Sequence, residues 1–289
     1  MLLVWDASQR SAPLPAGVGD IDFVAAFAIS EAKVGKDLTE AIFMPPNNFP
    51  HLSSDLAKAD VMVTRGLVDA SEVDRVAVAL AEARAEVLLY SAPSGRLETA
   101  QSYADAARKA GVAFVNTTSD AIARDPAWIR RFRAAGLPLL GDDLASQFGT
   151  SVVHNALLRL LEERGLHLVS SYQVNLGGTE DFRNLVENPN TKKQSKLNAL
   201  SAADKVQMAP LGYLSQLKSQ KVAHLNLEAQ GWGKTAISLD VKLTVHDPSG
   251  AAGVNIDLIR IAASALRNGH GGYPAEATPL LKSPPGTPI

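Results

Sequence analysis

The sequence contains no cysteine among its 289 residues. This absence excludes disulfide bonds, thiolate nucleophiles and cysteine-based metal sites. An excess of positive charge is also missing, because 28 lysines and arginines stand against 30 aspartates and glutamates, for a formal net charge of −2. A nucleic-acid-binding domain normally carries a basic excess, so we expect no nucleic acid as a partner.

Long apolar runs are absent as well. No apolar stretch reaches the ~18 residues that a membrane span requires. The first residues, MLLVWDASQR, have neither the basic segment nor the long apolar segment of a signal peptide. The six histidines show no metal-ligand spacing, so we expect no bound metal. These absences predict a cytoplasmic protein without membrane contact.

What the first half does contain is an alternation of short apolar runs with amphipathic stretches at helical spacing. Strands are predicted over 21–29, 60–66, 86–93, 112–119 and 137–143, and helices over 71–84, 98–111, 125–136 and 151–165. Strands that alternate with helices favour a parallel sheet covered on both faces. The sequence therefore predicts an α/β protein.

The second half has a different pattern. Residues 222–232 and 235–247 alternate apolar and polar side chains, which is typical of an antiparallel sheet with one covered face. The polar stretch 187–205 is predicted to form loops and short helices at a site or an interface, and residues 253–269 form a further amphipathic helix.

One segment combines features of a phosphate site. In GDDLASQFGTSVVHNALL, residues 141–158, a predicted strand leads through two aspartates and a turn of small residues into a helix. Such a turn offers free backbone N–H groups and the positive end of a helix dipole. Four further polar segments follow: YQVNLGGTEDFRNL (172–185), TKKQSK (191–196), the stretch 225–260, and LLKSPP (280–285).

In this order and at these spacings, the segments resemble the inositol-1-phosphate synthase family, in its short bacterial and archaeal type. FVAAF, KVGKDLTEAIF, AGVAFVN and DPAW extend the resemblance over residues 21–285. The resemblance implies a Rossmann-like parallel-sheet domain, residues 1–160 and 248–289, with an inserted α+β domain, residues 161–247, for catalysis and oligomerisation. It also implies a homo-oligomer, dimer or tetramer, with residues 222–247 as the interface element.

The family converts glucose 6-phosphate to inositol 1-phosphate. A tightly held NAD oxidises the sugar, lysines assist enolisation, an aldol step closes the ring, and NADH reduces the product. A cation stabilises a developing enolate, and a partly desolvated lysine can act as a base. The resemblance assigns catalysis to Lys192, Lys196, Lys221 and Lys282, and substrate binding to Asp143, Ser146, Gln147, Gly149, Asp181 and Asp247.

The chain departs from the family where NAD is held. The family has a strand, a G-x-G turn and a helix, in which glycines allow the pyrophosphate to approach. Here DASQRSAPLPAGVGD follows the first apolar residues, and Gly17-Val18-Gly19 precedes the second strand without a helix behind it. The family's FDVD pattern is replaced by Phe27-Ala28-Ile29-Ser30. We therefore expect no NAD cofactor.

Two departures lie nearer to the substrate. Ala145 stands where the family has a lysine, and Ser219 stands where it has an aspartate. Simpler interpretations also remain open for single residues. Asp142 either contacts a ligand or caps the adjacent turn, Asp181 is either a site residue or a turn former, and His154 is better explained as a buried structural histidine.

The leading hypothesis is an enzyme of this family that works without NAD. Its lysine cluster would support enolisation or aldol-type isomerase, lyase or cyclase chemistry on a carbonyl substrate, phosphorylated or not, in inositol or specialised metabolism. Two alternatives remain. One is a genuine inositol-1-phosphate synthase that holds NAD differently, and the other is a non-catalytic binding or scaffold protein.

Overall fold

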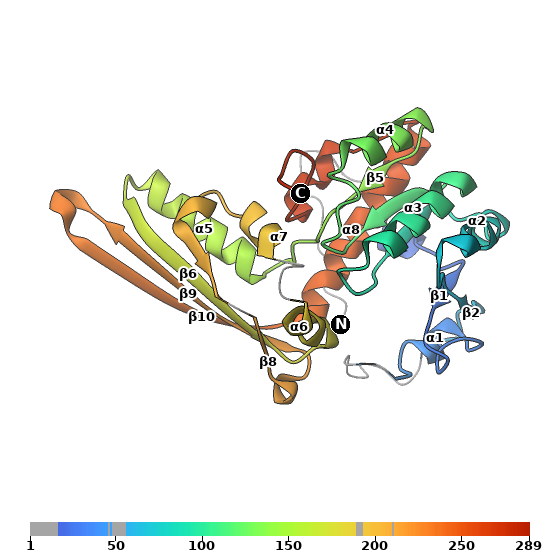
Figure 1. Ribbon diagram of the computed structural model, residues 1–289, viewed down its shortest axis with the longest axis horizontal. Coiled ribbons are helices and arrows are strands. Elements are labelled where there is room, and N and C mark those ends of the chain that lie inside the picture. The colour runs from blue at the N-terminus through green and yellow to red at the C-terminus, as the bar shows by residue number, and fades with distance from the viewer. Residues whose placement is uncertain (1–16, 46, 48–55, 189–192, 210) are drawn as a thin grey trace.

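The computed structural model describes residues 17–45, 47, 56–188, 193–209 and 211–289. These residues form two parts, which lie side by side in Figure 1: a Rossmann-like α/β part, and an elongated part built on an antiparallel sheet. No helix in the described ranges is long and apolar enough to cross a membrane. The described His, Asp and Glu side chains form no group of three that could hold a metal ion.

The Rossmann-like part confirms the predicted α/β class. Its strands are β1 (Ala26–Ala28), β2 (Val63–Arg65), β3 (Val87–Tyr90), β4 (Ala113–Asn116) and β5 (Leu139–Leu140). Its helices are α1 (Leu38–Ala41), α2 (Val73–Glu82), α3 (Leu97–Ala110), α4 (Pro126–Ala134) and α8 (Asp247–Arg267). All strand pairs are parallel.

Among the described residues, the five parallel strands do not form one continuous sheet. The strands form two separate sheets, β1–β2 and β3–β4–β5. The predicted strand 21–29 shrinks to three residues, and Phe23 and Val24 before it are 65% and 46% exposed. Residues without a neighbouring strand cannot complete the backbone hydrogen bonds of a ladder, so the pattern of apolar residues overestimates this strand.

Helices cover both faces of the larger sheet, as predicted. Successive residues of a strand point to opposite faces, and β4 shows this clearly. Phe114 packs into a cluster with Leu80 of α2 and Phe132 of α4. Its neighbour Val115 packs on the other side against Leu258 of α8. All of these side chains are buried.

The second part contains the five-stranded sheet and three helices. Its strands are β6 (His167–Gly177), β7 (Val206–Met208), β8 (Gly212–Tyr213), β9 (Gln220–Gln230) and β10 (Ala236–His246). Its helices are α5 (Thr150–Glu163), α6 (Glu180–Glu187) and α7 (Lys193–Asn198). The order is β10–β9–β6–β7, with β8 also paired to β6. The predicted antiparallel pair is confirmed as β9 and β10.

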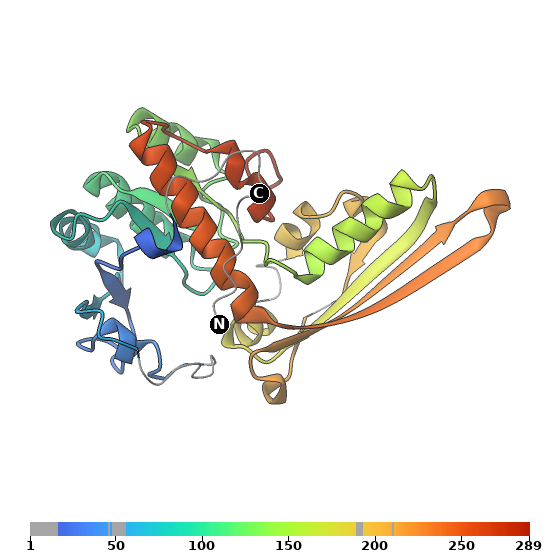
Figure 2. The ribbon, with the colours of Figure 1, turned by 180° about the vertical axis from the view of Figure 1, so that it is seen from behind.

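Helix α5 covers one face of this sheet. Leu158 and Leu161 pack against Leu227 and Ala229 of β9 in an apolar cluster. The predicted domain boundary at residue 160 therefore falls inside a helix that packs on the second sheet. A further difference concerns α8, which begins at Asp247, directly after β10, and not at residue 253. Figure 2 shows this helix running from the end of the antiparallel sheet across the Rossmann-like part.

Candidate active site

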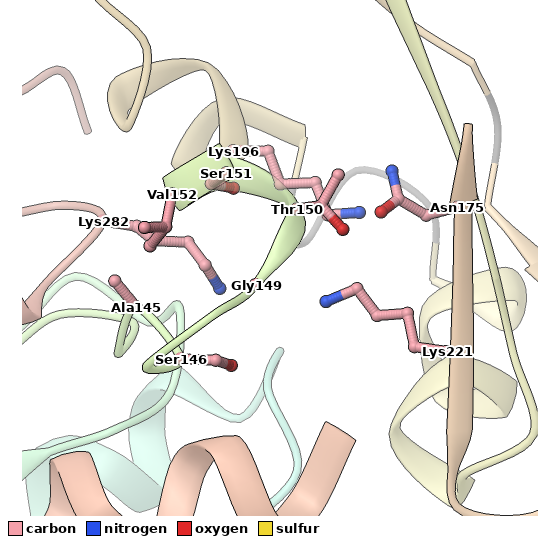
Figure 3. Close-up of a pocket in the computed structure, with 10 residues that line it drawn as sticks. All are labelled: Ala145, Ser146, Gly149, Thr150, Ser151, Val152, Asn175, Lys196, Lys221 and Lys282. Carbon is pink, nitrogen blue, oxygen red and sulfur yellow. The ribbon is translucent and has the colours of Figure 1, made fainter. Parts of the chain in front are cut away.

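A pocket lies where the two parts meet (Figure 3). About 300 Å³ of space not filled by protein atoms lies within it, and this space includes open solvent. Its lining comes from the turn before α5, the first turn of that helix, the inner faces of β6 and β9, α7 and the C-terminal segment: Ala145, Ser146, Gly149, Thr150, Ser151, Val152, Asn175, Lys196, Lys221 and Lys282.

The first turn of α5 forms one wall of the pocket. Gly149 is the N-cap residue, and no side chain caps the helix at this position. The first N–H groups of a helix have no partner within the helix, and they sit at the positive end of its dipole. Thr150 adds a buried hydroxyl that has no hydrogen-bond partner in the described part of the chain. This wall therefore suits an anion such as phosphate.

Three lysines from distant segments face this wall. Lys196 belongs to α7, Lys221 to β9 and Lys282 to the C-terminal segment, and their side chains point toward one another in Figure 3. Lys196 is only 8% exposed. Lys221 Nζ lies 3.1 Å from Asp247 Oδ1, and Lys282 Nζ lies 3.1 Å from Asp143 Oδ1. With two carboxylates among three ammonium groups, the site keeps a positive balance.

Backbone pairing explains how Lys282 reaches the site. The Lys282 N–H donates to Asp143 O at 2.7 Å, and the N–H groups of Asp142 and Ser283 each donate to the other residue's carbonyl oxygen, at 3.0 and 3.1 Å. The C-terminal segment thus runs antiparallel to the turn after β5. Asp143 contacts the lysine through both its backbone and its side chain.

The other predicted site residues divide into two groups. Ser146 and Gly149 line the pocket, and Asp247 contacts it through Lys221. Gln147 does not line it: a Cβ on Gly253 of α8 would stand 2.6 Å from Gln147 Nε2, so this side chain packs on that helix. Asp181 lies in the first turn of α6 and is not among the residues that line the pocket. Lys192 lies outside the described residues.

Asp142 is a structural residue of the turn. It is fully buried and accepts hydrogen bonds from the N–H groups of Ile122, Ala123 and Arg124. The guanidinium of Arg124 lies 3.3 Å away. Burial raises the pKa of Asp142 to about 6, against the opposing effect of these donors. The carboxyl is therefore ionised at neutral pH and anchors the turn that carries Asp143.

Sequence reasoning missed Thr150 and Asn175. Asn175 lies on β6, in a segment for which no strand was predicted from the sequence, so its side chain was not expected to face a pocket. The available signal was the spacing of Ser171, Gln173 and Asn175, which are polar at every second position. In a strand such residues share one face, and all three are buried here.

Comparison with known proteins shows which family the chain resembles. A family model described as myo-inositol-1-phosphate synthase matches residues 149–248. The inositol-3-phosphate synthase of Mycolicibacterium smegmatis is 39% identical, over 94% of this chain and 82% of the relative. The chain belongs to the myo-inositol-1-phosphate synthase family.

Solved structures support this assignment. The crystal structure of Ari2 is 50% identical, with a TM-score of 0.84, and the match covers 96% of this chain and 82% of Ari2. A myo-inositol-1-phosphate synthase-related protein from Thermotoga maritima is 23% identical, with a TM-score of 0.80, over 94% of this chain and 83% of that protein. The latter likeness shows that the synthase fold is shared.

The synthase family implies NAD, so we asked whether the described residues fit it. At the end of β1, Ala28 and Ser30 supply no carboxylate for a ribose, and Ile29 between them is 75% exposed. In the turn between β3 and α3, the N–H groups of Gly95 and Arg96 already donate to the carboxylate of Asp120. These two places do not fit a dinucleotide, and we derive no step through one.

Proposed function

We propose that the chain is an enzyme of the inositol-phosphate synthase type that performs enolisation and aldol-type chemistry on a phosphorylated sugar carbonyl. The observation that carries the proposal is the meeting of three lysines with the uncapped first turn of α5 in one pocket. The helix terminus suits the phosphate group. The ammonium groups suit the negative charge that develops on a carbonyl oxygen when a neighbouring proton is removed.

The roles follow from the positions of the lysines. Lys221 and Lys282 are each held by an aspartate, which orients the ammonium group as an electrostatic stabiliser. Lys196 is the most enclosed of the three. We assign it the part of the proton-transferring group, because a lysine enclosed among other cations is suited to general acid–base catalysis.

We further propose that the reaction proceeds without NAD, on a substrate that already carries a ketone or aldehyde. The support is the poor fit at the end of β1 and at the turn after β3. The neutral side chain of Ala145 in the pocket wall is a second difference from the family's pattern, and it leaves the site with one ammonium group fewer.

Two measurements on the purified protein test this proposal. Mass spectrometry and absorbance should find no stoichiometric NAD, and a panel of aldose and ketose phosphates should contain one that is consumed without added NAD. Bound NAD, or turnover of glucose 6-phosphate only when NAD is added, would establish the genuine synthase reaction instead. If no sugar phosphate is turned over with or without NAD, the non-catalytic alternative holds.

A further inference from the structure

A chain of buried polar groups lies behind the pocket. Asn226 O accepts a hydrogen bond from Ser171 Oγ at 2.5 Å, and that hydroxyl lies 2.8 Å from His154 Nε2. His154 Nδ1 lies 3.0 Å from Gln173 Nε2, and Asn175 Nδ2 donates to Gln173 Oε1 at 3.0 Å. The four side chains in this hydrogen-bonded chain, those of Ser171, His154, Gln173 and Asn175, are at most 3% exposed. The roles proposed above for the three lysines do not involve this hydrogen-bonded chain.

The direction of every hydrogen bond follows from one end of the chain. A backbone carbonyl only accepts, so the Ser171 hydroxyl must donate to Asn226 O. The hydroxyl oxygen then accepts from His154 Nε2–H. His154 Nδ1 carries no proton and accepts from Gln173 Nε2. Gln173 Oε1 therefore accepts from Asn175 Nδ2, and the amide oxygen of Asn175 is left for the pocket.

Among the residues that the structure describes, this oxygen has no other partner. Asn175 Oδ1 is buried without a hydrogen bond among the described residues. Figure 3 shows it turned into the pocket, beside Thr150 and the end of Lys196. A buried acceptor without a donor costs free energy, so its partner is expected to arrive with the ligand.

We propose that His154 is a positioning residue: its neutral imidazole, protonated on Nε2, holds the Asn175 amide oxygen toward the pocket, where that oxygen accepts a hydrogen bond from a substrate hydroxyl. The identity of the hydroxyl-bearing ligand rests on the proposed function. The hydrogen-bond geometry from which we infer the role of His154 does not depend on the proposed function. Burial lowers the pKa of His154 to about 4, which agrees with a neutral ring at physiological pH.

Protonation of His154 would reverse the chain. An imidazolium donates from both nitrogens, so Gln173 would have to turn its oxygen toward His154 Nδ1. The Gln173 amide nitrogen would then donate to Asn175 Oδ1, and Asn175 would present an N–H₂ group to the pocket. A hydroxyl bound as a donor would lose its acceptor. The protonation state of one buried histidine thus decides which group the pocket offers.

Nitrogen NMR of protein labelled with ¹⁵N-histidine tests the tautomer directly. The signals of His154 are identified by their loss in His154→Gln. At neutral pH we expect one protonated nitrogen, Nε2, and one unprotonated nitrogen, Nδ1. A proton on Nδ1 alone, or on both nitrogens, would overturn the proposal. This measurement needs no substrate, so its outcome is separate from the fate of the proposed function.

A carboxylate at position 175 tests the coupling along the chain. In Asn175→Asp the side chain beside the lysines only accepts, so Gln173 must turn its nitrogen toward it and its oxygen toward His154. We expect both nitrogens of His154 to become protonated at neutral pH. Ala145→Asp is the matched control, because it places a carboxylate in the same pocket but outside the chain. Neutral His154 in Asn175→Asp, or an equal change in the control, contradicts the coupling.

Kinetics with the sugar phosphate found active connects the chain to the substrate. A Gln at position 154 can donate to Ser171 and accept from Gln173, whereas Leu can do neither. We expect His154→Gln to keep kcat/KM within about threefold, and His154→Leu to lose about 10- to 100-fold, mostly through a higher KM. Equal losses in both folded variants would reduce His154 to a packing residue. Intact kinetics in His154→Leu would also sink the idea.

Discussion

Single residues of the pocket are held by partners from distant parts of the sequence. The aspartate that pairs with Lys282 lies in the turn after β5, and the one that pairs with Lys221 is the first residue of α8. Such pairs restrict the side chains before any ligand arrives, and a preorganised cation needs little rearrangement when charge develops. The contribution of each pocket lysine to activity can therefore be tested by substitution.

Removal of one ammonium group should lower activity far more than stability. We expect Lys196→Met and Lys282→Met to reduce kcat/KM by about 100-fold or more, the size of loss found when one electrostatic stabiliser is removed. Lys242→Met, at an exposed position of β10, is the control and should stay near the wild-type value. Steady-state kinetics, with circular dichroism to confirm folding, gives the answer. Near-normal activity of both pocket variants would remove the lysines from the mechanism.

Acidification should destabilise the fold through His154. A histidine in the unfolded chain titrates near 6.5, whereas burial lowers the pKa of His154 to about 4. Between these values the unfolded state binds one proton more, so falling pH favours unfolding. From about pH 7 to about pH 4.5, the wild type should lose roughly 2 to 3 kcal/mol more than His154→Gln. Urea denaturation of both proteins measures this, and parallel pH profiles would contradict it.

For single residues, the sequence predicted the pocket where the family resemblance assigned a role to a particular position. Lys196, Lys221, Lys282, Ser146 and Gly149 all line the pocket, although their roles stay predictions. Periodicity and composition alone could not have selected them, because a lysine in a polar segment is normally solvated surface. What brings them together is pairing between segments distant in the sequence, such as the C-terminal segment with the turn after β5 and β9 with β6, and local patterns carry no record of that.

Among the elements, β6 was missed for a physical reason. The strand directs Ser171, Gln173 and Asn175 inward, so its covered face is polar along the part that borders the pocket. A pattern search looks for apolar residues at alternate positions, and this strand does not have them there. By contrast, β9 directs Ala223, Leu225, Leu227 and Ala229 inward, all of them buried. That strand and its antiparallel partner were predicted correctly.

The turn after β6 should tolerate no side chain. A Cβ on Gly178 would stand 2.3 Å from Lys218 N and 2.7 Å from Leu217 C, which are backbone atoms that cannot move aside independently. Gly178→Ala should therefore lower the free energy of unfolding by roughly 2 kcal/mol or more. Gly19→Ala is the matched control, since nothing lies within 4 Å of its Cβ, and it should change stability by less than about 0.5 kcal/mol. Thermal or urea denaturation compares the two, and equal stabilities would refute the steric argument.

In the whole molecule, the site depends on the chain returning to the first domain. Helix α8 starts at the pocket with Asp247 and ends on the far side of the sheet β3–β4–β5, where its apolar residues complete the second core cluster. The C-terminal segment then comes back to the turn after β5 and delivers Lys282. The α/β class and the antiparallel pair β9–β10 were predictable from alternating patterns. The meeting of the two parts at one pocket was not, because it depends on this return path.

The largest scale of organisation, a homo-oligomer, stays a prediction. Strand β10 is an edge strand of eleven residues, and Trp232 at the tip of the β9–β10 hairpin is 95% exposed. Edge strands and exposed aromatic side chains are both commonly covered by a partner. We expect light scattering to give a mass that is a multiple of 30.6 kDa.

The part played by the hairpin is decided by a pair of substitutions. Trp232→Ser should shift the population toward the monomer, because it removes an aromatic anchor from the predicted interface element 222–247. Phe23→Ser removes an aromatic side chain that is 65% exposed on the Rossmann-like part, and it should leave the mass unchanged. A wild-type protein of 30.6 kDa contradicts the oligomer itself. An unchanged mass in Trp232→Ser, beside dissociation in Phe23→Ser, moves the interface to the other part of the molecule.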